Sequence, residues 1–297
     1  MIMLKKLILA PVFLIVLAFL IYQLAPFLKS YDIIFSLSSS SLVQLITLAF
    51  LILINGLIFN LFITFAQNWK MVLPLVLVAS FLPMLFLTPF LGLVFGLGVL
   101  ISLFLTYLAL TNKLKTYLTF NPNSLISPSV KQLTSLFILV FSLTYFLSIN
   151  QIIQKTGFQI PDSLIDTALK FTPIESSLPQ ETSQFSIPPE QLELLKQNPD
   201  LLKQYGLDPK ILDTPQNTTT NLIKQTLKDQ MQNLIKPYLN FIPAILALLL
   251  FISLQSIISV MNLLIHPLLW IIFYILEKTG FIKFTAETRL VKKMVVD

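Results

Sequence analysis

The sequence predicts an all-α fold: a polytopic membrane protein with about six transmembrane helices and a small extracytoplasmic helical domain inserted before the last span. Of its 297 residues, 55% are hydrophobic and only 11% are charged, a balance too apolar for a soluble globular chain. Apolar blocks long enough to cross a bilayer recur along the chain. One long polar interval, residues 150–237, interrupts them.

The first apolar block, residues 7–28, follows Lys5 and Lys6 and contains no charged residue. Cleaved signal peptides have a shorter apolar core, about 7–15 residues, that ends at a small-residue cleavage site. This block has neither feature, so we expect a retained first span. The second span is predicted at residues 42–65, after a linker that holds Lys29.

Residues 71–110 form an apolar stretch twice as long as one crossing requires, since about 20 helical residues cross the hydrocarbon core. Proline cannot continue a helix and restricts the residue before it, so we expect a turn at Thr88-Pro89. The stretch therefore predicts a tight hairpin of two spans, residues 71–87 and 90–111. The two prolines expected to kink its first arm are Pro74 and Pro83.

The fifth span is predicted at residues 133–149 and completes a five-span region over residues 1–149. The last region, residues 238–276, contains a span from about residue 241 to 264. Its apolar pattern continues further, and a straight helix to Leu276 would measure about 54 Å, longer than the bilayer is thick. A bend is therefore required.

Pro267 is the residue expected to break this helix. The segment after it, residues 267–276, carries Trp270 and Tyr274, and aromatic residues gather at membrane interfaces. We expect this segment to lie at the interface as a short amphipathic piece. Residues 277–297 follow as a cytoplasmic basic tail with five basic and three acidic residues.

Basic residues are distributed unequally between the connections predicted on the two sides of the membrane. With a cytoplasmic N-terminus, the inner segments hold eleven Lys and Arg, whereas the two short outer connections hold only Lys29. The positive-inside rule then predicts a multi-pass protein of the cytoplasmic membrane, with the lipid bilayer as its environment and both termini cytoplasmic. Residues 150–237 face outward, and their own lysines count little because long domains cross regardless of charge.

This outward interval contains ten acidic residues, eight lysines and nine prolines, which favours short helices with proline-punctuated connections. Its clearest helix is predicted at residues 220–236. Apolar side chains recur there at spacings of three and four, which gives one apolar face. That face either packs on the interval's own leucines or binds a protein partner. Its members are Ile223, Leu227, Met231, Leu234 and Tyr238.

The last span carries a polar stripe: Gln255, Ser259, Asn262 and His266 follow one another at spacings of four, three and four. At 100° per residue these side chains share one face of a helix. One interpretation is the wall of a hydrated half-channel that includes His266, the only histidine. The other is hydrogen bonding to neighbouring helices, worth about 0.6–2 kcal/mol each.

Two smaller patterns concern packing. Gly92 and Gly96 form a G-x-x-x-G motif, which lets a second helix approach closely, either inside the bundle or in a dimer. Asn55 and Asn60 lie within the second span, about 140° apart around the helix, so they do not form one site. We expect both to be packing contacts.

Chemistry is mostly excluded. With no cysteine and one histidine, the chain lacks thiolate nucleophiles and the usual zinc-ligand patterns, and no G-x-S-x-G motif occurs. No charged residue lies within any predicted span, although ion and proton pathways usually place such groups there. No basic run interleaved with aromatics suggests nucleic-acid binding. We therefore expect no enzyme activity, catalytic residue, cofactor or metal site.

Two functional hypotheses remain. The first is a non-enzymatic protein that presents residues 150–237 outside the membrane for assembly or interaction with a protein partner. The second is a permease or channel-like protein that uses the polar stripe of the last span.

Overall fold

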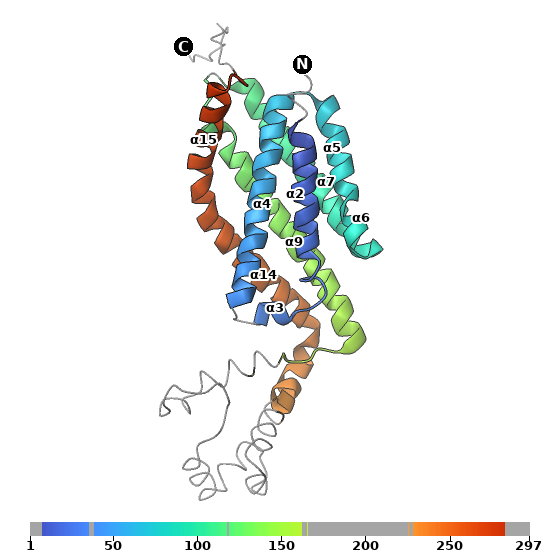
Figure 1. Cartoon of the computed structure of the whole chain (residues 1–297). Coiled ribbons are helices and arrows are strands. Elements are labelled where there is room, and N and C mark those ends of the chain that lie inside the picture. The colour runs from blue at the N-terminus through green and yellow to red at the C-terminus, as the bar shows by residue number, and fades with distance from the viewer. Residues whose placement is uncertain are drawn as a thin grey trace, which may run out of the picture.

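The computed structural model forms one bundle of long helices (Figure 1). It describes residues 8–35, 39–117, 119–161, 165, 225 and 228–282. No β-strand occurs among these residues, so the all-α class is confirmed for this part of the chain.

The long helices alternate in direction along the bundle (Figure 1). Helical residues 228–235 lead into η3. In chain order the elements are α2 (Leu9–Leu24), α3 (Asp32–Phe35), α4 (Ser39–Ala66), α5 (Trp69–Phe81), α6 (Pro83–Phe86), α7 (Pro89–Thr116), α8 (Pro122–Leu125), α9 (Ser127–Thr156), η3 (Lys236–Phe241), α14 (Ile242–Met261), η4 (Asn262–Leu264) and α15 (Ile265–Lys278).

Five helical segments among the described residues are long and apolar enough to cross a membrane. The helix α2 is also apolar, but its 16 residues fall short of the roughly 20 that a bilayer core requires. Length and hydropathy are therefore compatible with a multi-pass membrane protein. The five segments are Ser39–Ala66, Trp69–Phe86, Pro89–Thr116, Pro122–Thr156 and Lys228–Lys278.

The α5–α7 hairpin turns at Leu87 and Thr88, and α7 begins at Pro89. A second proline, Pro83, begins α6 and interrupts the first arm after α5. Proline at the first helical position loses no bond within the helix, which is why new helices begin at both prolines. Pro74 differs, because it lies inside α5 without ending it.

The helix α9 is longer than the predicted fifth span: it runs from Ser127 to Thr156, whereas hydropathy marked only residues 133–149. The added turns at both ends are rich in Ser, Gln and Lys, which lower hydropathy without preventing a helix. Gly157 follows with a φ of 73° and a ψ of 163°, a backbone conformation that glycine adopts far more readily than other residues. The helix therefore extends beyond its apolar part.

The last helix bends earlier than the sequence indicated. The interruption is the 3₁₀ turn η4, and Pro267 lies within the first turn of α15. Pro267 has no N–H for the carbonyl of Leu263, four residues before it, so the disturbance falls one turn upstream. Beyond the bend, α15 follows the bundle: Ile265, Leu269 and Phe273 pack in an apolar cluster with α4 and α8.

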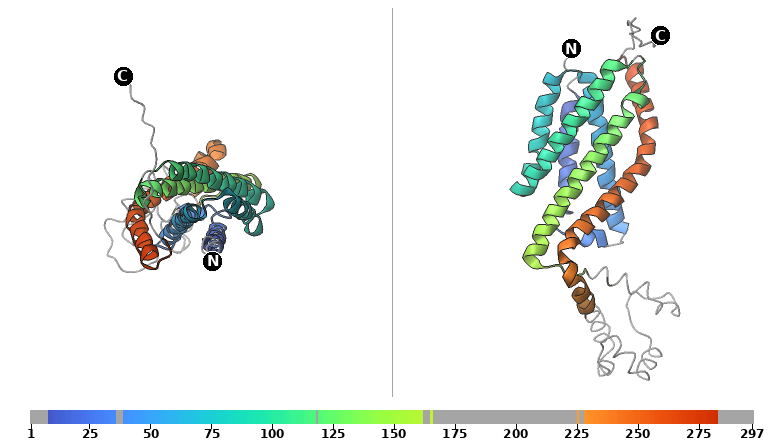
Figure 2. Two further views of the ribbon diagram at one scale, coloured as in Figure 1. Left: turned by 90° about the horizontal axis from the view of Figure 1, so that it is seen from above. Right: turned by 180° about the vertical axis from the view of Figure 1, so that it is seen from behind.

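The middle of the bundle is formed by α4 and α9. The helix α9 lies side by side with α7 and α14, while α4 packs against α2, α7, α9 and α14 (Figure 2). Between Leu48 and Ala66, buried residues occur on all sides of α4. This central position explains why Asn55 and Asn60, on opposite faces of α4, are both buried.

Candidate functional site

The polar stripe does not form one enclosed site. Gln255 and Asn262 are half-buried, whereas Ser259 and His266 are exposed. The 3₁₀ turn η4 begins at Asn262 and changes the helical twist before His266. The four residues therefore differ in burial along α14 and α15, and Gln255 bonds to Ser135 of α9.

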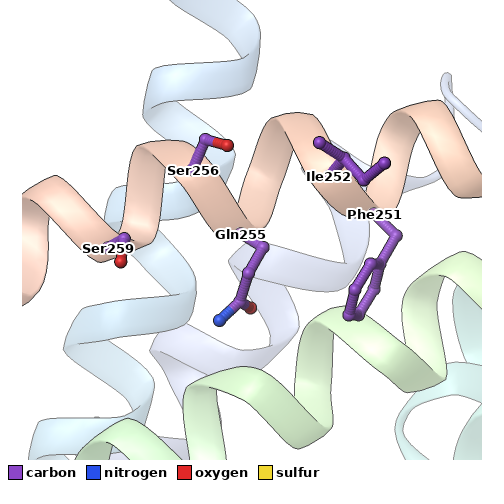
Figure 3. A pocket seen from close by; sticks show the side chains of 5 residues that line it. All are labelled: Phe251, Ile252, Gln255, Ser256 and Ser259. Carbon is purple, nitrogen blue, oxygen red and sulfur yellow. The ribbon is translucent and has the colours of Figure 1, made fainter.

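Gln255 lines an open surface pocket of about 260 Å³ with Phe251, Ile252, Ser256 and Ser259 (Figure 3). Its side chain points from α14 toward α9, while Ser256 points away (Figure 3). The amide nitrogen of Gln255 donates to Ser135 Oγ at 3.4 Å, beyond the usual length of such a bond. Its Oε1 is buried and has no partner. The buried Oδ1 of Asn262 likewise has no partner, so both amides of the stripe are only partly satisfied.

Asn55 and Asn60 are fully buried in α4, each with 0% exposure. Their amide nitrogens donate to backbone carbonyls one turn earlier, those of Leu51 at 3.0 Å and Gly56 at 2.7 Å. Both Oδ1 atoms lack a hydrogen-bond partner. The two residues do not meet each other or the stripe, because they point to opposite sides of a helix that is buried all round.

The glycines of α7 lie against three different helices. A Cβ at Gly92 would lie 2.9 Å from Met84 Cα of α6, and one at Gly96 would overlap the Ser80 carbonyl of α5. Gly98 instead lies against the side chain of Val140 in α9. The G-x-x-x-G motif therefore lies inside the bundle, where it closes the hairpin.

A further polar cluster lies where residues 150–237 join the bundle. After α9, the backbone of Gln159 forms two hydrogen bonds with the Tyr31 hydroxyl: its N–H donates to the oxygen, and its carbonyl accepts from it, each at 3.1 Å. The Tyr31 ring also packs on Phe158, with centroids 5.2 Å apart. The linker between α2 and α4 thus holds the segment that leaves α9.

The same segment is bonded on its other side by Gln232, which lies in the helix before α14. Gln232 donates to the carbonyl of Phe158 and accepts from the N–H of Ile160 at 3.3 Å. Phe158, Ile160 and Ile165 are buried in the main apolar cluster. We call residues 157–161, Tyr31 and Gln232 the root of the interval, since they join its two ends.

Sequence patterns did not reveal the root. Tyr31 is a lone aromatic in a linker, and Gln232 lies on the polar side of a predicted amphipathic helix. The bonds join residues that are 128, 72 and 74 positions apart, a pairing that no local pattern encodes. Two residues of the predicted apolar face, Ile223 and Leu227, lie outside the described residues.

The described residues contain no group of three or more His, Asp and Glu side chains that could hold a metal ion. The buried polar groups are amides and hydroxyls within helices, arranged for helix contacts rather than around one reactive atom. The arrangement supports packing, positioning and weak binding of neutral polar groups.

The fold defines a class: a bundle of apolar helices compatible, by length and hydropathy, with a multi-pass membrane protein. The chain matches no known protein family, no curated protein and no solved structure.

Proposed function

We propose that this chain is a six-span, non-enzymatic protein of the cytoplasmic membrane that presents residues 150–237 outside the membrane to a protein partner. The first turn of α2 and the last turn of α15 lie at one end of the bundle, which fits an even number of crossings (Figures 1 and 2). The end of α9 and the start of α14 lie at the other. With both termini cytoplasmic, the interval is extracytoplasmic, in agreement with the sorting of lysines.

The root is the observation that carries this proposal. An interval joined by one flexible connection could adopt any orientation, but here its two ends are bonded to each other and to the α2–α4 linker. Each such hydrogen bond contributes about 0.5–1.5 kcal/mol. The bundle is therefore suited to hold an interaction module in a defined place.

Topology is tested first. Ser183→Cys introduces a single thiol into a chain without cysteine. On intact cells, a membrane-impermeant maleimide should label this variant fully, while a matched Thr116→Cys variant, at the opposite end of the bundle, should react only after lysis. Labelling of the second variant alone would place the interval inside and overturn the proposal.

The interaction role is tested by replacing residues 166–224 with a short Gly-Ser linker, which leaves the root intact. Chemical cross-linking in cells, followed by affinity purification through a tag at residue 297, should recover a protein partner with the full chain. The shortened chain should fold and insert but lose that partner. Equal recovery by both chains, or none by either, would contradict the proposed role.

The transport hypothesis is favoured by one observation, the open pocket at Gln255 with its unpartnered Oε1. An uncharged site of this kind suits a small neutral polar solute. The test is glycerol uptake by vesicles that contain the purified protein. Faster uptake than in protein-free vesicles, abolished by Gln255→Leu with Asn262→Leu, would support transport, and equal uptake would remove this candidate.

A further inference from the structure

A second, larger cavity lies at the end of the bundle where α9 ends. Its volume is about 520 Å³, and three separate segments enclose it: the turn after α2, the turn between α6 and α7, and the last turns of α9. The polar side chains that line it are Lys29, Thr88, Ser148, Gln151 and Lys155. None of the described residues that line it carries a carboxylate.

Unequal helix lengths create this recess. The first arm of the hairpin, Trp69–Phe86, has 18 residues, or about 27 Å, whereas α9 has 30 residues, or about 45 Å. The hairpin therefore turns back before α9 ends, and the last turns of α9 form an uncovered wall. On the other side, Ser148 donates a hydrogen bond to the carbonyl of Leu28, which fixes the turn after α2 against α9.

The charge of the recess is positive. Lys29 and Lys155 both line it and are both exposed, and no ion pair to a carboxylate is formed by either within the described part of the chain. The nearby acidic side chain, Asp32, accepts a hydrogen bond from Ser30 Oγ at 2.8 Å instead. Two ammonium groups from different segments thus line one recess, and no described residue neutralises either of them with an ion pair.

The start of α7 adds donors to the same place. Thr88 precedes this 28-residue helix and makes no side-chain cap, and Pro89 contributes no N–H. The first hydrogen bond into the helix start is from the N–H of Gly92 to the carbonyl of Thr88 at 2.7 Å. The preceding amides, including that of the cavity residue Leu91, have no partner within the helix. Such a helix start favours an anion.

The surface beside the recess is strongly apolar. Leu85 of α6 is 79% exposed, and Phe86 and Phe90 are 40% and 54% exposed. They lie next to the turn that closes the cavity, on helices apolar enough to cross a membrane. A ligand that fits the lysine-lined recess and this apolar surface carries a negative phosphate and hydrocarbon chains.

We infer that this recess binds an anionic phospholipid, with its phosphate between Lys29 and Lys155 and its acyl chains on the exposed face of α6 and α7. The lipid closes the gap that the short hairpin leaves. This inference goes beyond the proposed function and does not depend on which side of the membrane the recess faces.

The test is lipid binding to the purified full chain in detergent, measured by native mass spectrometry with dioleoylphosphatidylglycerol. The wild type should retain one lipid. Replacing both lysines, Lys29→Gln with Lys155→Gln, should weaken apparent affinity by about tenfold or more. The arginine pair, Lys29→Arg with Lys155→Arg, should retain the lipid, since it keeps both charges.

Two further variants separate the site from general charge. Lys113→Gln with Lys115→Gln makes the same change of charge at the opposite end of α7 and should leave binding unchanged. Gln151→Trp fills the recess while both lysines remain, and it should weaken binding. Equal lipid retention by the wild type and the Lys29/Lys155 glutamine variant would overturn the inference. Displacement of the lipid by millimolar inorganic phosphate would assign the site to a free anion instead and would also overturn it.

Discussion

The α5–α7 hairpin and the last helical segment, Lys228–Lys278, both contain prolines, yet only the hairpin folds back on itself. In the hairpin, Pro83 and Pro89 each begin a new helix, and the glycines of α7 allow its backbone to touch α5 and α6. In the last segment, Pro267 interrupts the helix one turn earlier, at η4, and α15 continues along the bundle.

This difference shows that a proline sets the position at which a helix is interrupted. The size of the neighbouring residues then sets whether the next helix folds back or continues in the same direction. Small residues after Pro89 make close antiparallel packing possible. The residues after Pro267 are large and apolar, and they continue to pack on α4 and α8. The hairpin is consequently closely packed, whereas α14 keeps a half-buried amide beside an open pocket.

The largest expected effect is on the hairpin. Gly96→Leu would place a side chain where the Ser80 carbonyl lies, and backbone cannot move aside cheaply. We expect a loss of about 3 kcal/mol or more in the free energy of unfolding. Unfolding in mixed micelles measures it. Leu97→Phe enlarges the next residue of the same helix, which is exposed, and should change stability little.

An intermediate effect is expected at the start of the last segment. Gln232→Ala removes the side chain that bonds both Phe158 and Ile160, which should cost about 1–3 kcal/mol. Hydrogen exchange of the Ile160 amide should become faster, while exchange within α9 should not change. Asn233→Ala, at an exposed neighbouring position, is the control. Unchanged exchange at Ile160 would show that the root does not hold the two ends together.

The smallest effect is expected in the middle of α14. Gln255→Leu removes a long hydrogen bond and an unpartnered oxygen, so the stability should change by less than about 1 kcal/mol. Leu254→Gln, one residue earlier at a fully buried position, should instead destabilise strongly. A loss of several kcal/mol for Gln255→Leu would mean that this amide is a main packing contact.

Local physics made part of the fold predictable. The all-α class and the membrane-compatible helices were predicted from the length of the apolar segments. A backbone N–H or C=O without a partner is costly in lipid, and a helix pairs all of these groups within one segment. The position of the hairpin turn was expected from Thr88-Pro89, and the structure begins α7 at Pro89. Hydropathy underestimated α9, since it measures apolarity and not helicity.

The candidate sites were less predictable. The spacing of four polar residues predicted that they share one face of the last helix. It did not predict the 3₁₀ turn η4 or the exposure of His266. It also contained no sign of the root or of the recess at Lys29 and Lys155, whose members come from separate segments.

The sequence alone predicted apolar helices compatible with a membrane, and five of them are long enough in the structure, because apolarity and helicity depend on neighbouring residues. Only the tertiary structure decided which polar groups meet. Tyr31 contacts Gln159, and Lys29 shares a cavity with Lys155, because helices of unequal length pack side by side and bring distant segments to one end of the bundle.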